Sequence, residues 1–230
     1  MLTLNQLAGF GNSRSILPPE VPGLQFWVRS DLGVTKDGSD LVSDWADLSG
    51  NGRNATESTN KPLWVTSLIS GCPAIRFDGT NDKLLTGSFT VNQPLTVFVV
   101  SKNVTNTNAD RVWASSTSTA NPSLLQRAGP NLTLQSNNLD GATVVSDTTN
   151  FHLYKCVFNG TSSVIAKDNG SDQTNAGNLS GSITRMEIGA WNAGNFGNVE
   201  IAEMAVYDST ISGTNLTNIL EYFRDRYALW

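Results

Sequence analysis

Short segments rich in apolar and β-branched residues recur along this chain about every 8 to 15 residues, and polar turns separate them. The turns carry Gly, Asn and Asp, for example Lys36-Asp37-Gly38 and Asp168-Asn169-Gly170. This spacing is typical of an all-β sandwich of two antiparallel sheets. The segments expected to form strands are 24–28, 42–48, 73–77, 95–101, 111–115, 123–127, 132–135, 142–145, 152–158, 163–167, 184–189 and 199–207.

The composition agrees with many short strands. Only 15% of residues are charged, whereas Asn, Ser and Thr are abundant and 20 residues are Gly. Thr favours strands, and Asn, Ser and Gly favour turns. The most apolar segment, 95–101, is expected to be a central strand buried on both faces. One helix is expected at the C-terminus, because Leu216, Ile219, Leu220, Phe223 and Tyr227 share a helical face.

The charge and hydropathy of the chain limit the kinds of partner that it is expected to bind. The net charge is -5 and no Lys/Arg cluster occurs, which argues against a nucleic-acid-binding surface. No apolar run approaches the length of a membrane span. The first residues lack the charged start and apolar stretch of a secretory signal. Cys72 and Cys156 lie too far apart for a metal or redox motif, and we favour two buried thiols over a disulfide between them.

The first 22 residues differ from the rest. They carry several Gly and Pro residues, with apolar side chains at Leu2, Leu4, Leu7 and Phe10. We interpret residues 1–22 as an extended arm that docks on the domain or on an assembly partner. A simple lead-in strand is the alternative. Residues 23–230 are then the β-sandwich domain.

Three motifs in this domain carry a family resemblance. They are WADLSGNGRNA at 45–55, GCPAIRFDGTND at 71–82 and IAEMAVYD at 201–208. With the C-terminal helix, they make residues 23–229 resemble the bacterial and phage branch of the laminin-G-like, concanavalin A-like jelly rolls. The resemblance implies a two-sheet antiparallel jelly-roll sandwich with one C-terminal helix. It implies little about function, because unrelated activities share this fold.

The sequence offers few residues that could form a catalytic site. A retaining glycosidase needs two carboxylates about 5 Å apart, which on one strand means same-face positions. Glu200 and Glu203 are the closest pair of glutamates, and on a regular strand they face opposite sides. The single histidine, His152, stands near no nucleophile motif. We therefore predict that the chain is not an enzyme.

Two binding sites are predicted. Asp78, Asn81 and Asp82 crowd one turn, where they either hold Ca²⁺ or bond backbone N–H groups as turn-forming residues. Trp191, Asn192, Asn195 and Phe196 lie in a glycine-rich loop that could stack on a sugar and bond its hydroxyls. Trp64 is a second exposed-aromatic candidate, whereas Trp27 and Trp45 are expected in the core. The alternative for Trp191 and Phe196 is a plug at the end of the sandwich or a contact with a neighbour.

Two functional classes follow. The first is a structural or adhesive virion protein of a tailed phage, such as a head decoration, fibre or tail-attached lectin-like module. Its partners would be other virion proteins or copies of itself, and it would be assembled in the host cytoplasm. The second is a carbohydrate-binding module or bacterial surface adhesin, secreted or at the cell surface, that binds polysaccharide. No cofactor is expected apart from the open calcium site.

Overall fold

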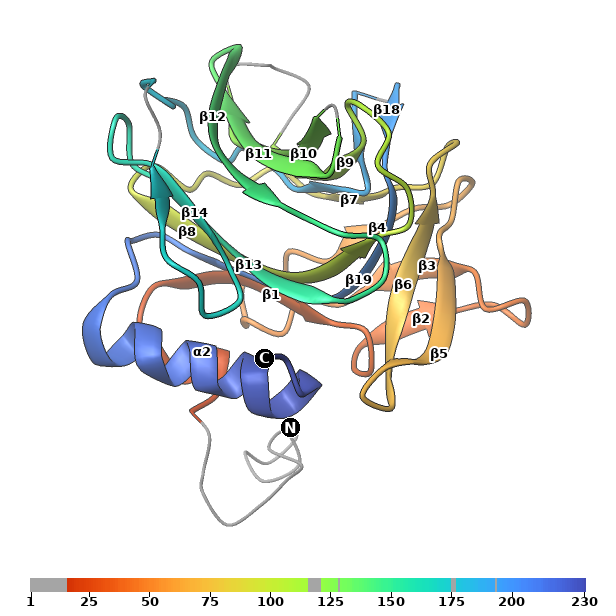
Figure 1. The fold of residues 1–230 in the computed structure, drawn as a ribbon. Coiled ribbons are helices and arrows are strands. Elements are labelled where there is room, and N and C mark those ends of the chain that lie inside the picture. Colours follow the sequence, from red (N-terminus) through yellow and green to blue (C-terminus); the bar gives the residue numbers. More distant parts are fainter. Residues whose placement is uncertain (1–15, 116–120, 128, 175–176, 193) are drawn as a thin grey trace.

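The computed structural model describes residues 16–115, 121–127, 129–174, 177–192 and 194–230. Two antiparallel sheets face each other, and helix α2 (Gly213–Tyr227) lies against the outer side of one of them (Figure 1). The expected all-β, two-sheet sandwich with one C-terminal helix is confirmed. The described helix is neither long nor apolar enough to cross a membrane.

Sheet A carries the helix. Its strands are, in spatial order, β15 (Gln173–Thr174), β14 (Val164–Lys167), β13 (His152–Phe158), β8 (Leu95–Asn103), β19 (Asn198–Tyr207), β6 (Cys72–Asp78) and β5 (Leu63–Ile69). A further strand, β1 (Leu24–Arg29), also pairs with β19. β1 and β6 pair with different halves of β19, so the longest strand ties the sheet together.

Sheet B forms the opposite layer. Its strands are, in spatial order, β12 (Leu139–Val145), β11 (Asn131–Ser136), β10 (Ser123–Arg127), β9 (Arg111–Ala114), β16 (Glu187–Ile188), β7 (Leu84–Thr86), β4 (Ala55–Thr56), β3 (Val42–Trp45) and β2 (Val34–Lys36). A separate hairpin follows β16 and consists of β17 (Ala190–Trp191) and β18 (Asn195–Phe196). A short 3₁₀ turn, η1 (Pro18–Glu20), precedes β1.

Two hydrophobic clusters lie on the two faces of sheet A. The inner cluster fills the space between the sheets and includes Trp45, Trp113 and Phe77. The outer cluster joins sheet A to α2 and includes Trp27, Phe98 and Phe223. Strand β8 supplies both clusters, because its alternate side chains point to opposite faces. This explains its continuous apolar sequence and confirms its central, fully buried position.

A β-bulge in β19 turns a buried carboxylate toward the helix. The register between β19 and β8 shifts between Ile201 and Glu203. Glu203 is fully buried and accepts hydrogen bonds from Trp27 Nε1 at 2.6 Å, Tyr222 Oη at 2.8 Å and Tyr227 Oη at 2.7 Å. Arg226 Nε lies 3.3 Å away. Glu203 therefore anchors the C-terminal half of α2 to sheet A.

The first motif of the family resemblance builds a loop. Asp47 Oδ1 accepts the backbone N–H groups of Trp27 and Ser49, and its Oδ2 accepts that of Arg53. Trp45 Nε1 donates to the carbonyl of Arg29 at 2.7 Å. Trp27 and Trp45 are buried, as predicted. The motif residues thus fasten the turn after β3 to β1.

Part of the predicted N-terminal arm is described. Residues 16–22 lie against the outer cluster, where Leu17 and Val21 are buried and the Tyr207 hydroxyl donates to the carbonyl of Pro18. Leu2, Leu4, Leu7 and Phe10 lie outside the described residues, so the boundary between arm and domain stays a prediction. Cys72 and Cys156 are unpaired thiols, and Cys156 is fully buried in β13.

Candidate functional site

Four of the five predicted glycan-binding residues lie together in the β17–β18 hairpin. Trp191 pairs with Asn195, and Phe196 pairs with Ala190. Asn192 has a left-handed backbone, and its N–H donates to Glu187 Oε2 at 3.1 Å. The Trp191 ring is half-buried, and the guanidinium of Arg111 lies 5.2 Å from its centroid. The hairpin is therefore a polar turn with a cation stacked on its indole.

Trp64 does not join this hairpin. It lies on β5, at the edge of sheet A, and packs against the inner cluster. Its Nε1 donates to the carbonyl of Ser30 at 2.7 Å, and Lys36 Nζ lies 3.9 Å from the ring centroid. Both the edge and the face of this indole are already occupied.

The predicted calcium turn is bonded to its own backbone. Asp78 Oδ1 accepts the N–H groups of Thr80 and Asn81, and Asp82 Oδ2 accepts the N–H of Asp78. Burial and the neighbouring Asp78 raise the pKa of Asp82 to about 6. The described residues include no cluster of three or more His, Cys, Asp or Glu side chains placed to hold a metal. Calcium binding stays a prediction here, and the contacts correspond to the turn-forming alternative.

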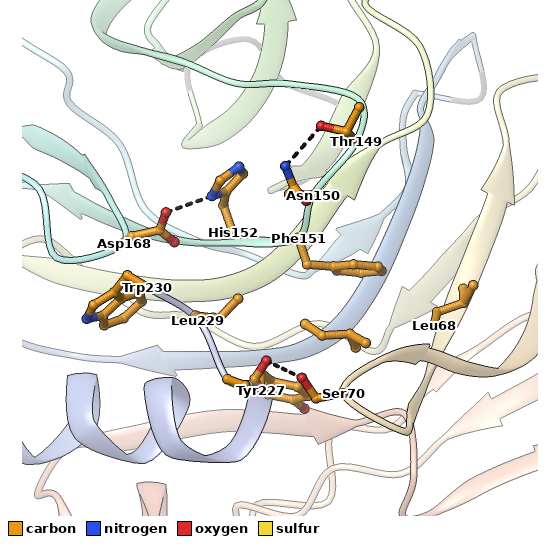
Figure 2. Close-up of a pocket in the computed structure, with 12 residues that line it drawn as sticks. Leu68, Ser70, Thr149, Asn150, Phe151, His152, Asp168, Tyr227, Leu229 and Trp230 are labelled. Atoms are coloured by element: carbon orange, nitrogen blue, oxygen red, sulfur yellow. Dashed lines mark hydrogen bonds and ion pairs between the residues drawn. The ribbon is translucent and has the colours of Figure 1, made fainter.

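A cavity that the sequence does not reveal opens beside the C-terminal end of α2 (Figure 2). Its volume is about 440 Å³, within the usual range of small-ligand sites. Four segments line it: residues 68–70 at the end of β5, residues 149–152 leading into β13, Asp168 directly after β14, and residues 227–230 at the end of α2 and beyond it. We call it the C-terminal pocket.

Apolar and polar groups both face the C-terminal pocket. The indole of Trp230 stands at its rim with 47% of the residue exposed, and Phe151 and Leu229 form apolar walls (Figure 2). Ser70 Oγ donates to the carbonyl of Tyr227 at 2.6 Å, and Asn150 Nδ2 donates to Thr149 Oγ1 at 3.0 Å. Ser, Thr and Asn side chains each keep further donor or acceptor capacity in such bonds.

His152 is held between two carboxylates at the wall of the pocket. Its Nδ1 lies 2.6 Å from Asp168 Oδ2, and its Nε2 lies 2.7 Å from Asp147 Oδ2. The hydrogen bond to Asp168 raises the pKa of His152; burial opposes the rise, and the contact with Asp147 supports it. Burial raises the pKa of Asp147, but hydrogen bonds from the Asn150 N–H and from His152 outweigh it and hold that pKa far below its usual value. His152 is thus clamped between two acids that favour its protonated form.

This clamp predicts a pH dependence that is simple to measure. The chain contains one histidine, so one imidazole signal reports it in a proton NMR titration of untagged protein. We expect the pKa of His152 above about 6.5 in the folded protein, and we expect Asp168→Asn to lower it. Because the folded state holds the proton more tightly, this contribution to stability is complete below about pH 6.5 and is lost as the pH rises through the folded pKa. A folded pKa at or below 6.5 would contradict the clamp.

The two glutamates considered for catalysis, Glu200 and Glu203, both form structural ion pairs or hydrogen bonds. Glu200 is buried and pairs with Arg76 at 2.5 Å and with Lys102 at 2.6 Å. Glu203 holds α2. The bulge between Ile201 and Glu203 alters the regular alternation that the sequence argument assumed. Neither carboxylate lines the C-terminal pocket.

No protein-family model and no curated protein matches this chain. Solved structures match in fold. A Trypanosoma rangeli sialidase in complex with sialic acid matches 98% of this chain and 37% of its own length, with a TM-score of 0.62 and 11% identity. Domain 4 of a GH43 extracellular arabinanase from Geobacillus stearothermophilus, in complex with arabinotriose, has a TM-score of 0.64 and 14% identity over 87% of this chain and 98% of that domain. A GH54 arabinofuranosidase has a TM-score of 0.61 and 13% identity over 81% of this chain and 51% of its own.

These matches show that the chain has a β-sandwich fold that domains of glycosidases also have, and the chain spans little more than a third of the sialidase. They contradict the prediction that the chain is not an enzyme, because the proteins that share its fold are a sialidase, an arabinofuranosidase and a domain of an arabinanase. That prediction relied on the absence of a suitably placed carboxylate pair and of a nucleophile motif in this sequence. A domain can lack such a pair and still belong to an enzyme whose catalytic groups lie in another domain.

Proposed function

We propose that this chain is a saccharide-binding domain of a glycan-processing enzyme and that the C-terminal pocket holds the sugar. The observation that carries the proposal is the pairing of an exposed indole with side-chain hydroxyl, amide and carboxylate groups around one cavity. A sugar ring presents apolar C–H faces and polar edges, and a Trp ring beside hydrogen-bonding groups complements both.

The geometry of the pocket suits this role. Trp230 offers its ring at the rim, and Asn150, Ser70 and Asp168 offer polar atoms from three other segments (Figure 2). The backbone around Trp230 is fixed, because Tyr227 is bonded to Glu203 and Ala228 caps the helix in a left-handed conformation. A preorganised site binds with less ordering cost.

Two further observations support the proposal. An arabinanase domain of similar fold and nearly the same extent was solved with arabinotriose bound, so the fold is compatible with holding a short oligosaccharide. The three sequence motifs and the jelly-roll arrangement of the sheets also favour the finer assignment to the concanavalin A-like, laminin-G-like group. The virion role and its partners stay predictions, because the arm residues on which they depend lie outside the described part of the chain.

Trp230→Ala should weaken saccharide binding at least about 30-fold, because a central Trp at a binding site contributes about 2 kcal/mol or more. The measurement is isothermal titration with a panel of neutral oligosaccharides that includes arabinotriose. The free energy of unfolding should change by about 1 kcal/mol or less, since nearly half of the residue is exposed.

Val145→Ala is the matched control, because Val145 is 60% exposed on β12, away from the pocket. It should leave both affinity and stability unchanged. Equal affinities of the wild type and Trp230→Ala for every sugar that binds would exclude the C-terminal pocket. Failure of the wild type to bind any neutral or acidic saccharide would refute the proposed function.

A further inference from the structure

Arg111 is a buried cation that the described part of the chain does not neutralise. Only 4% of the residue is exposed, and its Nε and Nη1 atoms are buried without a hydrogen-bond partner. Among the described residues, its side chain donates one hydrogen bond, from Nη2 to Gln135 Oε1, a neutral acceptor, at 3.1 Å. It forms no ion pair with a described carboxylate. A buried charge without an ionic partner is costly, so an anion that reaches Arg111 would be stabilised there.

A second arginine, Arg127, adds positive charge near Arg111. Burial, and after it the neighbouring Arg127, lower the pKa of Arg111, and Asp140 opposes them; together they bring this pKa to about 10. Asp140 is the carboxylate whose charge acts on Arg111, and Arg127 Nη2 binds it at 2.5 Å. Gln135 Nε2 also donates to Asp140, at 3.0 Å. Arg127 thus holds the ion pair with Asp140, and Arg111 holds none with a described carboxylate.

Hydrogen bonds connect Arg111 to an ion pair at the surface. Gln135 links Arg111 to Asp140, and Asp140 and Arg127 have side chains that are 48% and 30% exposed. An exposed ion pair contributes little stability, so Asp140 can leave at small cost. On the other side, the Trp191 ring lies against the guanidinium, and Asn192 is exposed in the same hairpin.

We propose that Arg111 binds the carboxylate of an acidic sugar residue, with Trp191 and Asn192 against the sugar ring. This inference extends the proposed saccharide-binding function to a second site and a second ligand class. A guanidinium matches a carboxylate with paired N–H donors, and two of the nitrogens of Arg111 are unused. In the bound state the sugar carboxylate replaces Asp140 as the counter-charge.

The test uses trigalacturonate as the probe and its fully methyl-esterified form as the neutral control. The wild type should bind the acid, with affinity falling as salt is added, and should bind the ester at least about 30-fold more weakly. Arg111→Gln should bind the acid more weakly than the wild type by the same factor. It should be as stable as the wild type, because the unpaired buried charge is gone. Asp140→Asn should bind the acid as tightly as the wild type or more tightly, since the competing carboxylate is removed.

Arg53→Gln is the matched control, because Arg53 also lies over an aromatic ring, 4.3 Å from Phe89, and the substitution changes net charge equally. It should bind the acid as the wild type does. If Arg111→Gln fails to fold, Arg111→Lys keeps the charge, lacks the planar fork and should still lose affinity. Unchanged affinity in the folded Arg111 variant overturns the inference, as does sulfate binding as tightly as the acid.

The two proposals fail in different ways. If Trp230→Ala rather than Arg111→Gln abolishes trigalacturonate binding, the acid occupies the C-terminal pocket, and only the Arg111 site is overturned. If the wild type binds arabinotriose but not trigalacturonate, the Arg111 site is again overturned alone. If no saccharide of either kind binds, both proposals fall.

Discussion

Glu203→Ala should lower the free energy of unfolding by about 3–5 kcal/mol, because breaking a buried charge network leaves several groups without partners. Trp27, Tyr222 and Tyr227 would each lose a hydrogen-bond acceptor in a fully buried site. The measurement is chemical denaturation followed by the fluorescence of the tryptophans. Glu203→Gln keeps one acceptor oxygen and should cost less than the alanine variant.

The effect should extend to the C-terminal pocket. Glu203 holds Tyr227, and Trp230 follows three residues later, so loosening α2 displaces the indole at the rim. Glu221→Ala is the matched control on the exposed face of α2 and should change stability by about 0.5 kcal/mol or less. If Glu203→Ala is as stable as Glu221→Ala, the carboxylate does not anchor the helix.

Gly197→Ala should destabilise the domain by about 3 kcal/mol, because packing leaves no room for a methyl group. A Cβ on Gly197 would lie 2.0 Å from the backbone carbonyl oxygen of Arg111. Backbone cannot rotate away as a side chain can, so β9 or the hairpin must shift. The same variant should weaken trigalacturonate binding, because the contact with Gly197 positions Arg111 beneath Trp191. Both effects are measured by denaturation and by titration.

Gly194→Ala provides the control within the same hairpin. A Cβ on Gly194 would lie 3.7 Å from the carbonyl oxygen of Asn192, which is an ordinary van der Waals contact. It should fold as stably as the wild type to within about 1 kcal/mol. A Gly197→Ala variant that matches it in stability would show that the two chain segments are not packed as described.

Much of the sandwich could be predicted from local pattern. The segments 123–127 and 152–158 form β10 and β13 with those same bounds, and the heptad-like spacing from Leu216 to Tyr227 falls within α2. Strand β5 was missed because its pattern is interrupted. Ser67 has a left-handed backbone there, and the register with β6 shifts between Val65 and Ile69. Two-residue strands such as β4 and β15 are defined by their pairing partners, which the local sequence does not contain.

The candidate sites were less accessible to sequence reasoning. The loop chemistry around Trp191 was visible, but Arg111 lies in another strand, and nothing local marks it as unpaired. The C-terminal pocket combines segments around residues 69, 150, 168 and 230, which only the fold brings together. Their residue types are ordinary for turns. The feature that marks this site is a single cavity lined by an exposed indole, a carboxylate and an amide. It arises only from the tertiary structure, so the sequence does not show it.

The most direct test of saccharide binding at the C-terminal pocket is an NMR titration of the wild type with the tightest neutral sugar from the panel. Two reporters lie in the pocket wall, the single imidazole of His152 and the indole N–H of Trp230, which Trp230→Phe assigns by its disappearance. We expect both signals to shift together and to saturate at the Kd given by calorimetry. Binding by calorimetry with both signals unmoved would contradict the account, because the sugar would then lie elsewhere on the domain.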